Sequence, residues 1–512
     1  MPRLIAAIDA GTTSTRCILF DEAGAPAASA QREHRQITPR PGWLEHDPQE
    51  LWANTAAVVA EAIARAGASS ADIAAVGLTN QRETTLLWER DTGRPVHNAI
   101  VWSDARTADL CETLKREGAL TSRGKSAFTT PGIDRFRPAT GLPIATYFSA
   151  TKLAWLLENV PGARHRAEQG ELCFGTVDTW LLRHLTGRFV TDVTNASRTM
   201  LMGLGELAWR DDLLEAFDIP RQLLPEIQPS VAGNFGVTMR SGPFAGEIPV
   251  AAVLGDQQAA LFGQCCFEPG EAKNTYGTGC FMLLNTGDTP VASAAGLLTT
   301  PACQFAGRPP VYALEGSVAV AGSLVQWLRD NLGIIEASPD VEALADGATD
   351  SNGVIFVPAF GGLFAPYWDS TARGTILGLT AQSTRAHIAR AALDATCFQS
   401  ADVFDAMTAD SGRALAVLNV DGGMAVNDRM LQFQADVLGV PVARPAYTES
   451  TAAGAAFAAG LAVGFWKDES ALRKLRRIER TFEPSIGEGE RRALRETWHR
   501  AVERSRGWLG AR

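Results

Sequence analysis

Short apolar runs followed by clusters of glycine and hydroxyl residues mark the first part of the chain. Residues 4–8 form a continuous apolar run typical of a buried strand, and residues 15–20 predict a second strand. The polar segment 9–14 between them predicts a turn, so the two runs are expected to pair as an antiparallel hairpin. Another buried strand is predicted at residues 74–78.

The clearest helix signal lies between this hairpin and the strand at 74–78. Asp47 suits an N-cap, and Pro48 suits the first helical position, where the backbone needs no N–H. The segment that follows predicts a helix that ends near Ala66, before Gly67. Strands and helices mixed with a hairpin indicate an α/β sheet with helices on its faces.

The second half of the chain repeats this pattern. Residues 272–276 and 280–285 predict another hairpin around the Gly-Thr-Gly turn at 277–279. A further apolar run, 415–420, leads into the Asp-Gly-Gly turn at 421–423. Strand ends are where ligands bind in α/β sheets, although each turn alone also suits an ordinary strand connection.

Two similar halves predict two related α/β domains with mixed sheets flanked by helices, residues 1–260 and 261–512, and an active-site cleft between them. The longest apolar run, 452–466, is mostly Ala and Gly and is shorter than a membrane span. It therefore predicts a closely packed core helix. The charge-rich segment from Lys467 onward predicts solvent-exposed helix.

Composition narrows the classes of protein that fit this pattern. The 512 residues are 46% hydrophobic and 20% charged, which is typical of globular domains rather than disordered or fibrous chains. The net charge of −10 is a poor match for nucleic acid or an anionic membrane. Eight scattered cysteines without zinc-ligand spacing predict buried free thiols. Without a signal-peptide pattern, we expect a cytoplasmic protein with no membrane-spanning segment.

The first polar turn carries residue types that bind phosphate. Asp9 precedes a glycine and three hydroxyl residues, Thr12, Thr13 and Ser14. Backbone N–H groups and hydroxyls in such a turn can surround a phosphate, and the carboxylate can hold Mg²⁺. A plain hairpin turn is the alternative, but the similar turn at 277–279 strengthens the phosphate interpretation.

Two familiar nucleotide-binding motifs are incomplete. The Gly-Lys-Ser segment at 124–126 resembles the end of a Walker A loop, but Ala119 stands where that motif needs glycine. The turn at 277–279 lacks the third glycine of the dinucleotide fingerprint, because Met282 occupies its position. Neither motif assigns a function.

Three segments with polar or aromatic residues directly follow apolar strands. Arg82 and Glu83 are adjacent and oppositely charged, which suits a grip on hydroxyl groups, although a surface ion pair is the simpler interpretation. Asp256 could accept a hydroxyl proton as a general base or cap a helix. Trp102 suits either the core or a pocket wall.

Taken together, these segments resemble the FGGY carbohydrate kinases, and among them the members that phosphorylate glycerol. The resemblance covers residues 8–464. Its longest stretches are GLTNQRETT at 77–85, TDVTNASRTML at 191–201, GDQQAAL at 255–261 and AKNTYGTGCF at 272–281. It implies two ribonuclease-H-like domains, as in actin and the heat-shock ATPase chaperones, with ATP and Mg²⁺ as cofactors and a homodimer or homotetramer as the assembly.

The resemblance also implies roles for individual residues. Glycerol would be held by Arg82, Glu83, Tyr147, Asp256 and Gln257, with Trp102 and Phe281 against its carbons. The phosphates would lie near Thr12, Thr13, Ser14 and Arg16, and Mg²⁺ near Asp9 and Asp256. In the second domain the nucleotide would contact Thr278, Gly322, Gln326, Gly423 and Asn427.

The reaction implied is in-line transfer of the γ-phosphoryl group of ATP to glycerol, giving sn-glycerol 3-phosphate. Asp256 would be the general base, and Arg16 would balance charge on the transferred group. A related sugar kinase acting on a ketose or an aldonate is the first alternative, but it should lack the Arg82–Glu83, Trp102 and Phe281 combination. A non-catalytic nucleotide switch or chaperone on the same fold is the second, and it would need no base at Asp256.

Overall fold

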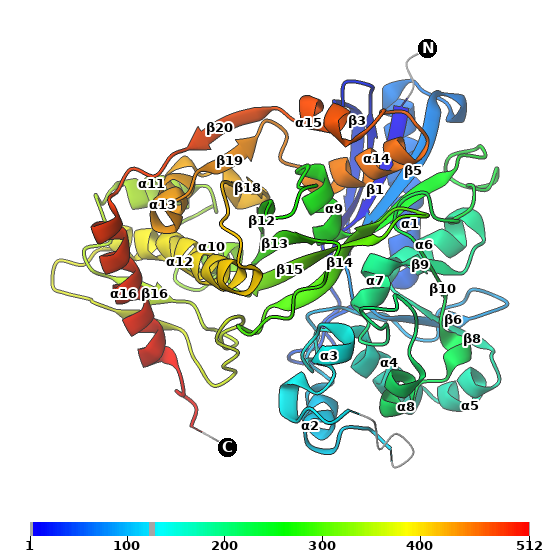
Figure 1. Ribbon diagram of the computed structural model, residues 1–512, viewed down its shortest axis with the longest axis horizontal. Helices are drawn as coiled ribbons and strands as arrows, with labels where there is room; N and C mark the ends of the chain where they lie inside the picture. Colours follow the sequence, from blue (N-terminus) through cyan, green and yellow to red (C-terminus); the bar gives the residue numbers. More distant parts are fainter. Residues whose placement is uncertain (1–3, 122–127, 511–512) are drawn as a thin grey trace.

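The structure is a computed structural model that describes residues 4–121 and 128–510 (Figure 1). Two large mixed sheets lie side by side, one formed by the first half of the chain and one by the second. This arrangement confirms the α/β class and the two related halves expected from the repeated hairpin. The Gly-Lys-Ser segment at 124–126 lies outside the described residues.

The first sheet has five strands in the order β11-β5-β1-β2-β3. They are β1 (Leu4–Ala10), β2 (Ser14–Phe20), β3 (Pro26–Glu33), β5 (Ile73–Asn80) and β11 (Val250–Gly255). β1 and β2 form the predicted antiparallel hairpin, whereas β5 runs parallel to both β1 and β11. The carboxyl ends of β1, β5 and β11 therefore meet at one edge of the sheet.

Helices cover both faces of this sheet. α1 (Pro48–Ala66) packs on β2 and β3 and has the predicted ends: Asp47 accepts a hydrogen bond from the Gln49 N–H, and Gly67 takes a left-handed conformation at φ 60°. The predicted core helix is α14 (Ser450–Ala462), which ends four residues early. It packs on β1, β5 and β11, so a helix from the second half of the chain completes the first core.

Small residues let α14 approach its neighbours closely. A Cβ on Gly77 of β5 would lie 2.1 Å from the Ala455 carbonyl oxygen, and one on Gly454 would lie 1.8 Å from that of Ala259. Backbone cannot yield at these distances. The Ala- and Gly-rich composition of the run is thus a packing requirement, as its sequence suggested.

The second sheet has seven strands in the order β14-β15-β13-β12-β18-β19-β20. They are β12 (Ala272–Tyr276), β13 (Cys280–Gly287), β14 (Leu298–Gln304), β15 (Pro310–Val318), β18 (Leu418–Asp421), β19 (Val442–Pro445) and β20 (Ile478–Phe482). β12 and β13 form the second predicted hairpin, and β18 runs parallel to β12.

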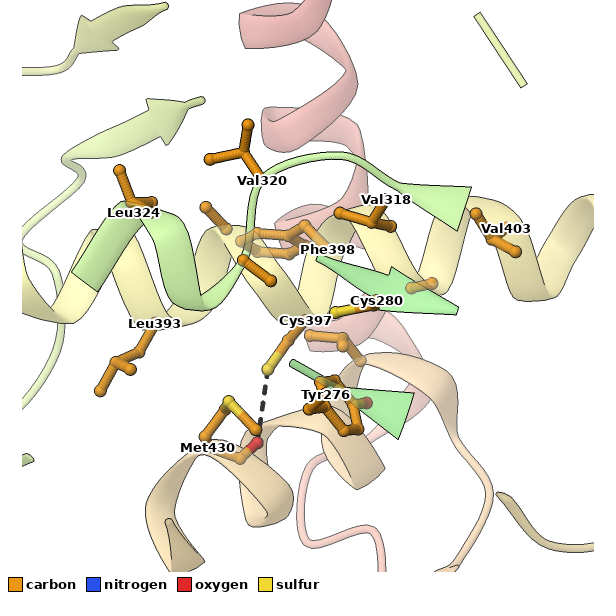
Figure 2. Packing of buried hydrophobic residues seen from close by; sticks show 14 of the residues in the cluster. Tyr276, Cys280, Val318, Val320, Leu324, Leu393, Cys397, Phe398, Val403 and Met430 are labelled. Carbon is orange, nitrogen blue, oxygen red and sulfur yellow. Dashed lines mark hydrogen bonds between the residues drawn. The ribbon is translucent and has the colours of Figure 1, made fainter. Parts of the chain in front are cut away.

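The long helix α12 (Arg385–Ser411) supports one face of the second sheet. Figure 2 shows Cys397 and Phe398 of this helix beside Tyr276 and Cys280 of the hairpin. The Cys397 thiol donates to the Met430 carbonyl oxygen at 3.3 Å. All eight cysteines are buried and unpaired, as predicted.

The charged tail differs from its prediction. It contains α15 (Glu469–Leu475) and α16 (Glu488–Ser505), but also β20, which pairs with β19 at the sheet edge. α16 is not wholly exposed, because Trp498 is buried against Phe398 at a ring distance of 5.3 Å. No helix in the described ranges combines the length and apolar character needed to cross a bilayer.

The remaining elements surround the two sheets. Further helices are α2 (Ala108–Glu117), α3 (Arg137–Thr140), α4 (Ser149–Asn159), α5 (Ala163–Glu168), α6 (Val177–Thr186), α7 (Val193–Ser197), α8 (Asp211–Phe217), α9 (Asp256–Gly263), α10 (Gly322–Asp330), α11 (Asp340–Asp346) and α13 (Asp428–Leu438). Short strand pairs are β4 (Glu45–His46) with β7 (Ala99–Ile100), β6 (Leu86–Glu89) with β8 (Leu172–Gly175), β9 (Val190–Asp192) with β10 (Glu226–Gln228), and β16 (Ile355–Val357) with β17 (Thr375–Leu377).

Candidate active site

The turn between β1 and β2 presents the predicted hydroxyl residues at the edge of the first sheet. The Gly11 N–H donates to the Ser14 carbonyl oxygen at 2.9 Å and closes the turn. Thr13 is exposed, and Thr12 and Ser14 are partly exposed. The Trp102 indole N–H donates to the Thr12 hydroxyl at 2.9 Å, which joins the predicted pocket wall to the predicted phosphate turn.

Asp9 and Arg16 lie opposite each other across this hairpin. Burial raises the pKa of the Asp9 carboxyl to about 7; Arg16 lowers it, whereas Asp256 and Glu449 raise it further. The Arg16 guanidinium pairs with Glu449, and its Nε donates to Gln31 at 3.0 Å. Glu449 immediately precedes α14, so both halves of the chain contribute charge beside the turn.

Five charged side chains form a continuous ion network, defined here as Asp256, Arg82, Glu315, Arg198 and Glu83. Arg82 lies 3.0 Å from Asp256 through Nε and donates to both Glu315 oxygens at 2.6 and 2.9 Å. Arg198 donates to Glu83 at 2.5 Å and to Glu315 at 3.2 Å. The signs alternate along the chain of contacts, so each charge faces an opposite one.

The simpler interpretation of Arg82 and Glu83, a surface ion pair, is wrong. Arg82 is 2% exposed and Glu83 is 1% exposed, and each binds a different partner. The left-handed backbone at Glu83, with φ 59°, accompanies this separation of neighbouring side chains. Burying them requires compensating charges, because an unpaired ion in the interior is strongly disfavoured.

The network shifts its carboxyl groups in opposite directions. Burial by itself raises the pKa of Glu315, but Arg198 and Arg82 lower it to about 2. For Glu83 burial is the dominant effect and raises the pKa, against the lowering by Arg198 and Arg82. Glu315 is therefore the fixed negative charge at the centre of the network.

Three aromatic rings from separate segments stand beside these charges. The Trp102 ring centroid lies 5.4 Å from that of Tyr147 and 6.2 Å from that of Phe281. Phe281 belongs to β13 of the second sheet, whereas Trp102 follows β7 and Tyr147 precedes α4. The Arg198 guanidinium lies 5.4 Å from the Tyr147 ring centroid. Trp102 is partly exposed, which fits a pocket wall rather than the core.

Asp256 begins α9 directly after β11, and its side chain is 27% exposed. Its Oδ1 accepts the Gln257 N–H at 2.7 Å. The preceding Gly255 N–H donates to the Thr194 hydroxyl at 2.8 Å. A Cβ on Gly255 would lie 2.7 Å from the Arg82 side chain, so glycine at this position lets Arg82 reach Asp256.

All five residues predicted to contact the nucleotide line one pocket of about 360 Å³ beside the second sheet. They are Thr278, Gly322, Gln326, Gly423 and Asn427. The Gly322 N–H donates to the Gly277 carbonyl oxygen at 3.0 Å, and a Cβ on Gly322 would lie 2.6 Å from that oxygen. The apolar side chains of Val325, Val341 and Val426 also line the pocket.

The carboxylates near the first turn suit a magnesium ion. No cluster of three or more His, Cys, Asp or Glu side chains that could hold a metal occurs within the described residues. Mg²⁺ typically needs only one or two carboxylates, because phosphate oxygens and water complete its shell. Asp9 and Asp256 fit that donor set.

Sequence reasoning missed three buried charges, Arg198, Glu315 and Lys273. Arg198 and Lys273 lie within two of the stretches that carry the family resemblance, and the partners of Arg198 are more than 100 positions away. The sequence could have indicated Glu315, because it is a lone acid inside the apolar run of β15. A charge at a buried strand position indicates a partner elsewhere.

Comparison with known proteins agrees with this arrangement. The N-terminal domain of the FGGY family of carbohydrate kinases matches residues 4–263, and the C-terminal domain matches residues 272–463. A glycerol kinase from Methylorubrum populi is 57% identical over 99% of each chain, and one from Roseiflexus sp. is 54% identical over 99% of this chain and 100% of that protein.

A solved structure shows the same fold over nearly the whole length. The glycerol kinase of Plasmodium falciparum, crystallised with ADP, has a TM-score of 0.88 and 37% identity and covers 98% of each chain. A gluconate kinase from Lactobacillus acidophilus has a TM-score of 0.83 at 23% identity, which supports the fold alone.

Proposed function

The chain belongs to the FGGY family of carbohydrate kinases, and we propose that it transfers the γ-phosphoryl group of ATP to glycerol. The proposal rests on polar and aromatic side chains that lie close together. Asp256 contacts Arg82 and accepts from the Gln257 N–H. The Trp102 ring lies near that of Phe281 and donates to Thr12 in the predicted phosphate turn. A triol offers three hydroxyls and little apolar surface. Charged partners for the hydroxyls and close aromatic walls suit such a molecule.

In the proposed complex, Arg82 donates to a glycerol hydroxyl. Three of its five N–H groups donate to Gln258 and to both oxygens of Glu315, and its Nε forms an ion pair with Asp256 at 3.0 Å. The second N–H on Nη2 would bind the substrate. Glu83 accepts from a hydroxyl, and Arg198 holds that carboxylate in place. Donor and acceptor thus face glycerol from adjacent positions in sequence.

Asp256 accepts the proton of the hydroxyl that attacks. The hydroxyl oxygen then bonds to the γ-phosphorus as the bond to the bridging β-phosphate oxygen breaks, and ADP leaves. Arg16 would leave Glu449 and balance charge on the transferred group. Thr12, Thr13 and Ser14 offer hydroxyl and backbone N–H groups to the phosphates.

Mg²⁺ bound at Asp9 and Asp256 would neutralise charge on the β- and γ-phosphates. The pocket of Thr278, Gly322, Gln326, Gly423 and Asn427 would hold the rest of the nucleotide. Its glycines allow close approach of backbone to phosphate, and its valines suit the apolar face of a base.

The experiment measures ADP release with Mg-ATP and one of four conditions: glycerol, D-xylulose, D-gluconate or no acceptor. Turnover that requires glycerol supports the proposal. Turnover with a sugar alone would keep the fold and overturn the choice of acceptor. Acceptor-independent ATP hydrolysis would instead favour a nucleotide switch on the same fold.

A further inference from the structure

A third buried cation, Lys273, lies beside the ion network on β12. Its ammonium donates to the Gln257 side-chain oxygen, to the Thr275 hydroxyl at 2.8 Å and to the Phe281 carbonyl oxygen at 3.1 Å. The side chain is fully buried. Its contacts therefore connect the start of α9 with both strands of the hairpin in the second sheet.

The chemistry of an ammonium group dictates how the Gln257 amide is oriented. A protonated lysine can only donate hydrogen bonds, so it faces the amide oxygen Oε1 and not the amide nitrogen. Nε2 of Gln257 then points away from Lys273, as a donor. Without the ammonium, the two ends of the amide could exchange places.

We propose that Lys273 is a positioning residue that holds Gln257 with Nε2 toward the acceptor hydroxyl. The inference rests on the proposed function, because Gln257 is assigned to glycerol there. Asp256 accepts from one hydroxyl, and Gln257 donates to a hydroxyl oxygen next to it. Lys273 thereby decides which polarity of partner the site accepts.

Charges from four elements face Lys273. They are Asp421 on β18, Asp256 on α9, Glu315 on β15 and Arg82 after β5. Burial lowers the pKa of Lys273 to about 8, against the three carboxylates that raise it. The ammonium is therefore present below about pH 8 and is lost above it. A neutral amine has a lone pair and two N–H groups for three acceptors, so its hold on Gln257 weakens at high pH.

The test is a double-mutant cycle of Lys273→Met and Gln257→Ala, with kcat and KM for glycerol and for ATP. We expect each single variant to raise the glycerol KM about tenfold, the size of one lost hydrogen bond, with the ATP KM within about twofold. Because Lys273 acts through Gln257, adding Lys273→Met to Gln257→Ala should cost little more. Thr275→Val is the matched control: it removes another acceptor of the same ammonium and should change the glycerol KM far less.

Multiplied effects in the double variant, or equal rises in both KM values, would overturn the inference. A second arm needs no Lys273 variant: kcat/KM for glycerol should fall above about pH 8 in the wild type, and this fall should disappear in Gln257→Ala. If kcat/KM falls above about pH 8 in Gln257→Ala as it does in the wild type, the inference is also overturned. Absence of glycerol phosphorylation by the wild type would instead refute the proposed function, before any variant is compared.

Discussion

The proposed glycerol site around Asp256 and the proposed nucleotide pocket around Gly322 are built from different kinds of groups. The first relies on side-chain charges, with five ions in contact at 2.5 to 3.2 Å. The second relies on backbone and small or apolar residues, such as Gly322, Gly423 and Val341. A small triol must be held by directional bonds to its hydroxyls. A nucleotide offers a charged end and a flat base, so close backbone and apolar walls suffice.

Side chains of the proposed glycerol site come from both halves of the chain, since Glu315 and Phe281 belong to the second sheet. The lining residues of the nucleotide pocket all lie between 276 and 427. Substitutions in the ion network should therefore affect stability as well as catalysis. Substitutions in the nucleotide pocket should affect nucleotide binding.

The largest effect on the reaction is expected from Asp256→Asn. Loss of the proton acceptor should reduce kcat by about 10²- to 10⁴-fold. ADP affinity measured without Mg²⁺ should stay near the wild-type value, because Asp256 is not among the residues that line the nucleotide pocket. Steady-state kinetics measure kcat, and titration calorimetry measures ADP affinity. A kcat near the wild-type value would show that Asp256 is not the general base.

Arg198→Met should produce the largest loss of stability. It leaves Glu83 and Glu315 buried with one cation fewer, which typically costs about 3–5 kcal/mol. Arg221→Met removes an exposed pair with Asp211 and should cost at most about 1 kcal/mol. Chemical denaturation gives both free energies of unfolding, and equal losses would contradict the importance of the network.

Acid should weaken the network through Glu315. Its folded pKa of about 2 lies below the ordinary value of 4.5, so its contribution is fully present above about pH 4.5. It is lost as pH falls toward 2, by about 3 kcal/mol at most. Unfolding measured from pH 6 to 3 should show a steeper loss in the wild type than in Arg198→Met, where the pKa is held down less. Identical slopes would argue against this origin.

The smallest of these effects concerns the nucleotide pocket. In Gly322→Ala the new Cβ must displace the Gly277 carbonyl, and we expect ADP affinity about tenfold weaker with the glycerol KM unchanged. Gly361→Ala, where a Cβ meets no atom within 4 Å, is the control. If the glycerol KM changed as much as ADP affinity, the two sites would not be separable.

Some predictions stay untested by the fold. The division into residues 1–260 and 261–512 is one of them, because α14 belongs to the second half and packs on the first sheet. The homodimer or homotetramer is another. The roles of the individual site residues are proposals that the variants above can decide.

Local signals determined much of this protein without any structure. The Asp47 cap, the Gly67 stop, the two hairpins and their glycine turns each depend on a few neighbouring residues, so the sequence alone predicts them. The Ala- and Gly-rich run likewise required close packing wherever it lay. The strand β20 was missed because its edge pairing with β19 leaves an exposed, charged pattern that resembles a helix surface.

Only the tertiary structure decided which charges meet. Arg82 and Glu83 are neighbours in sequence and yet bind Glu315 and Arg198, which are 233 and 115 positions away. A buried ion depends on what the fold places opposite it, and nothing within a few residues of Arg82 specifies Glu315. Composition and local spacing thus determine the elements and their turns. The long-range pairing that turns polar residues into a site exists only once the two sheets are packed together, because electrostatic contacts act across space rather than along the chain.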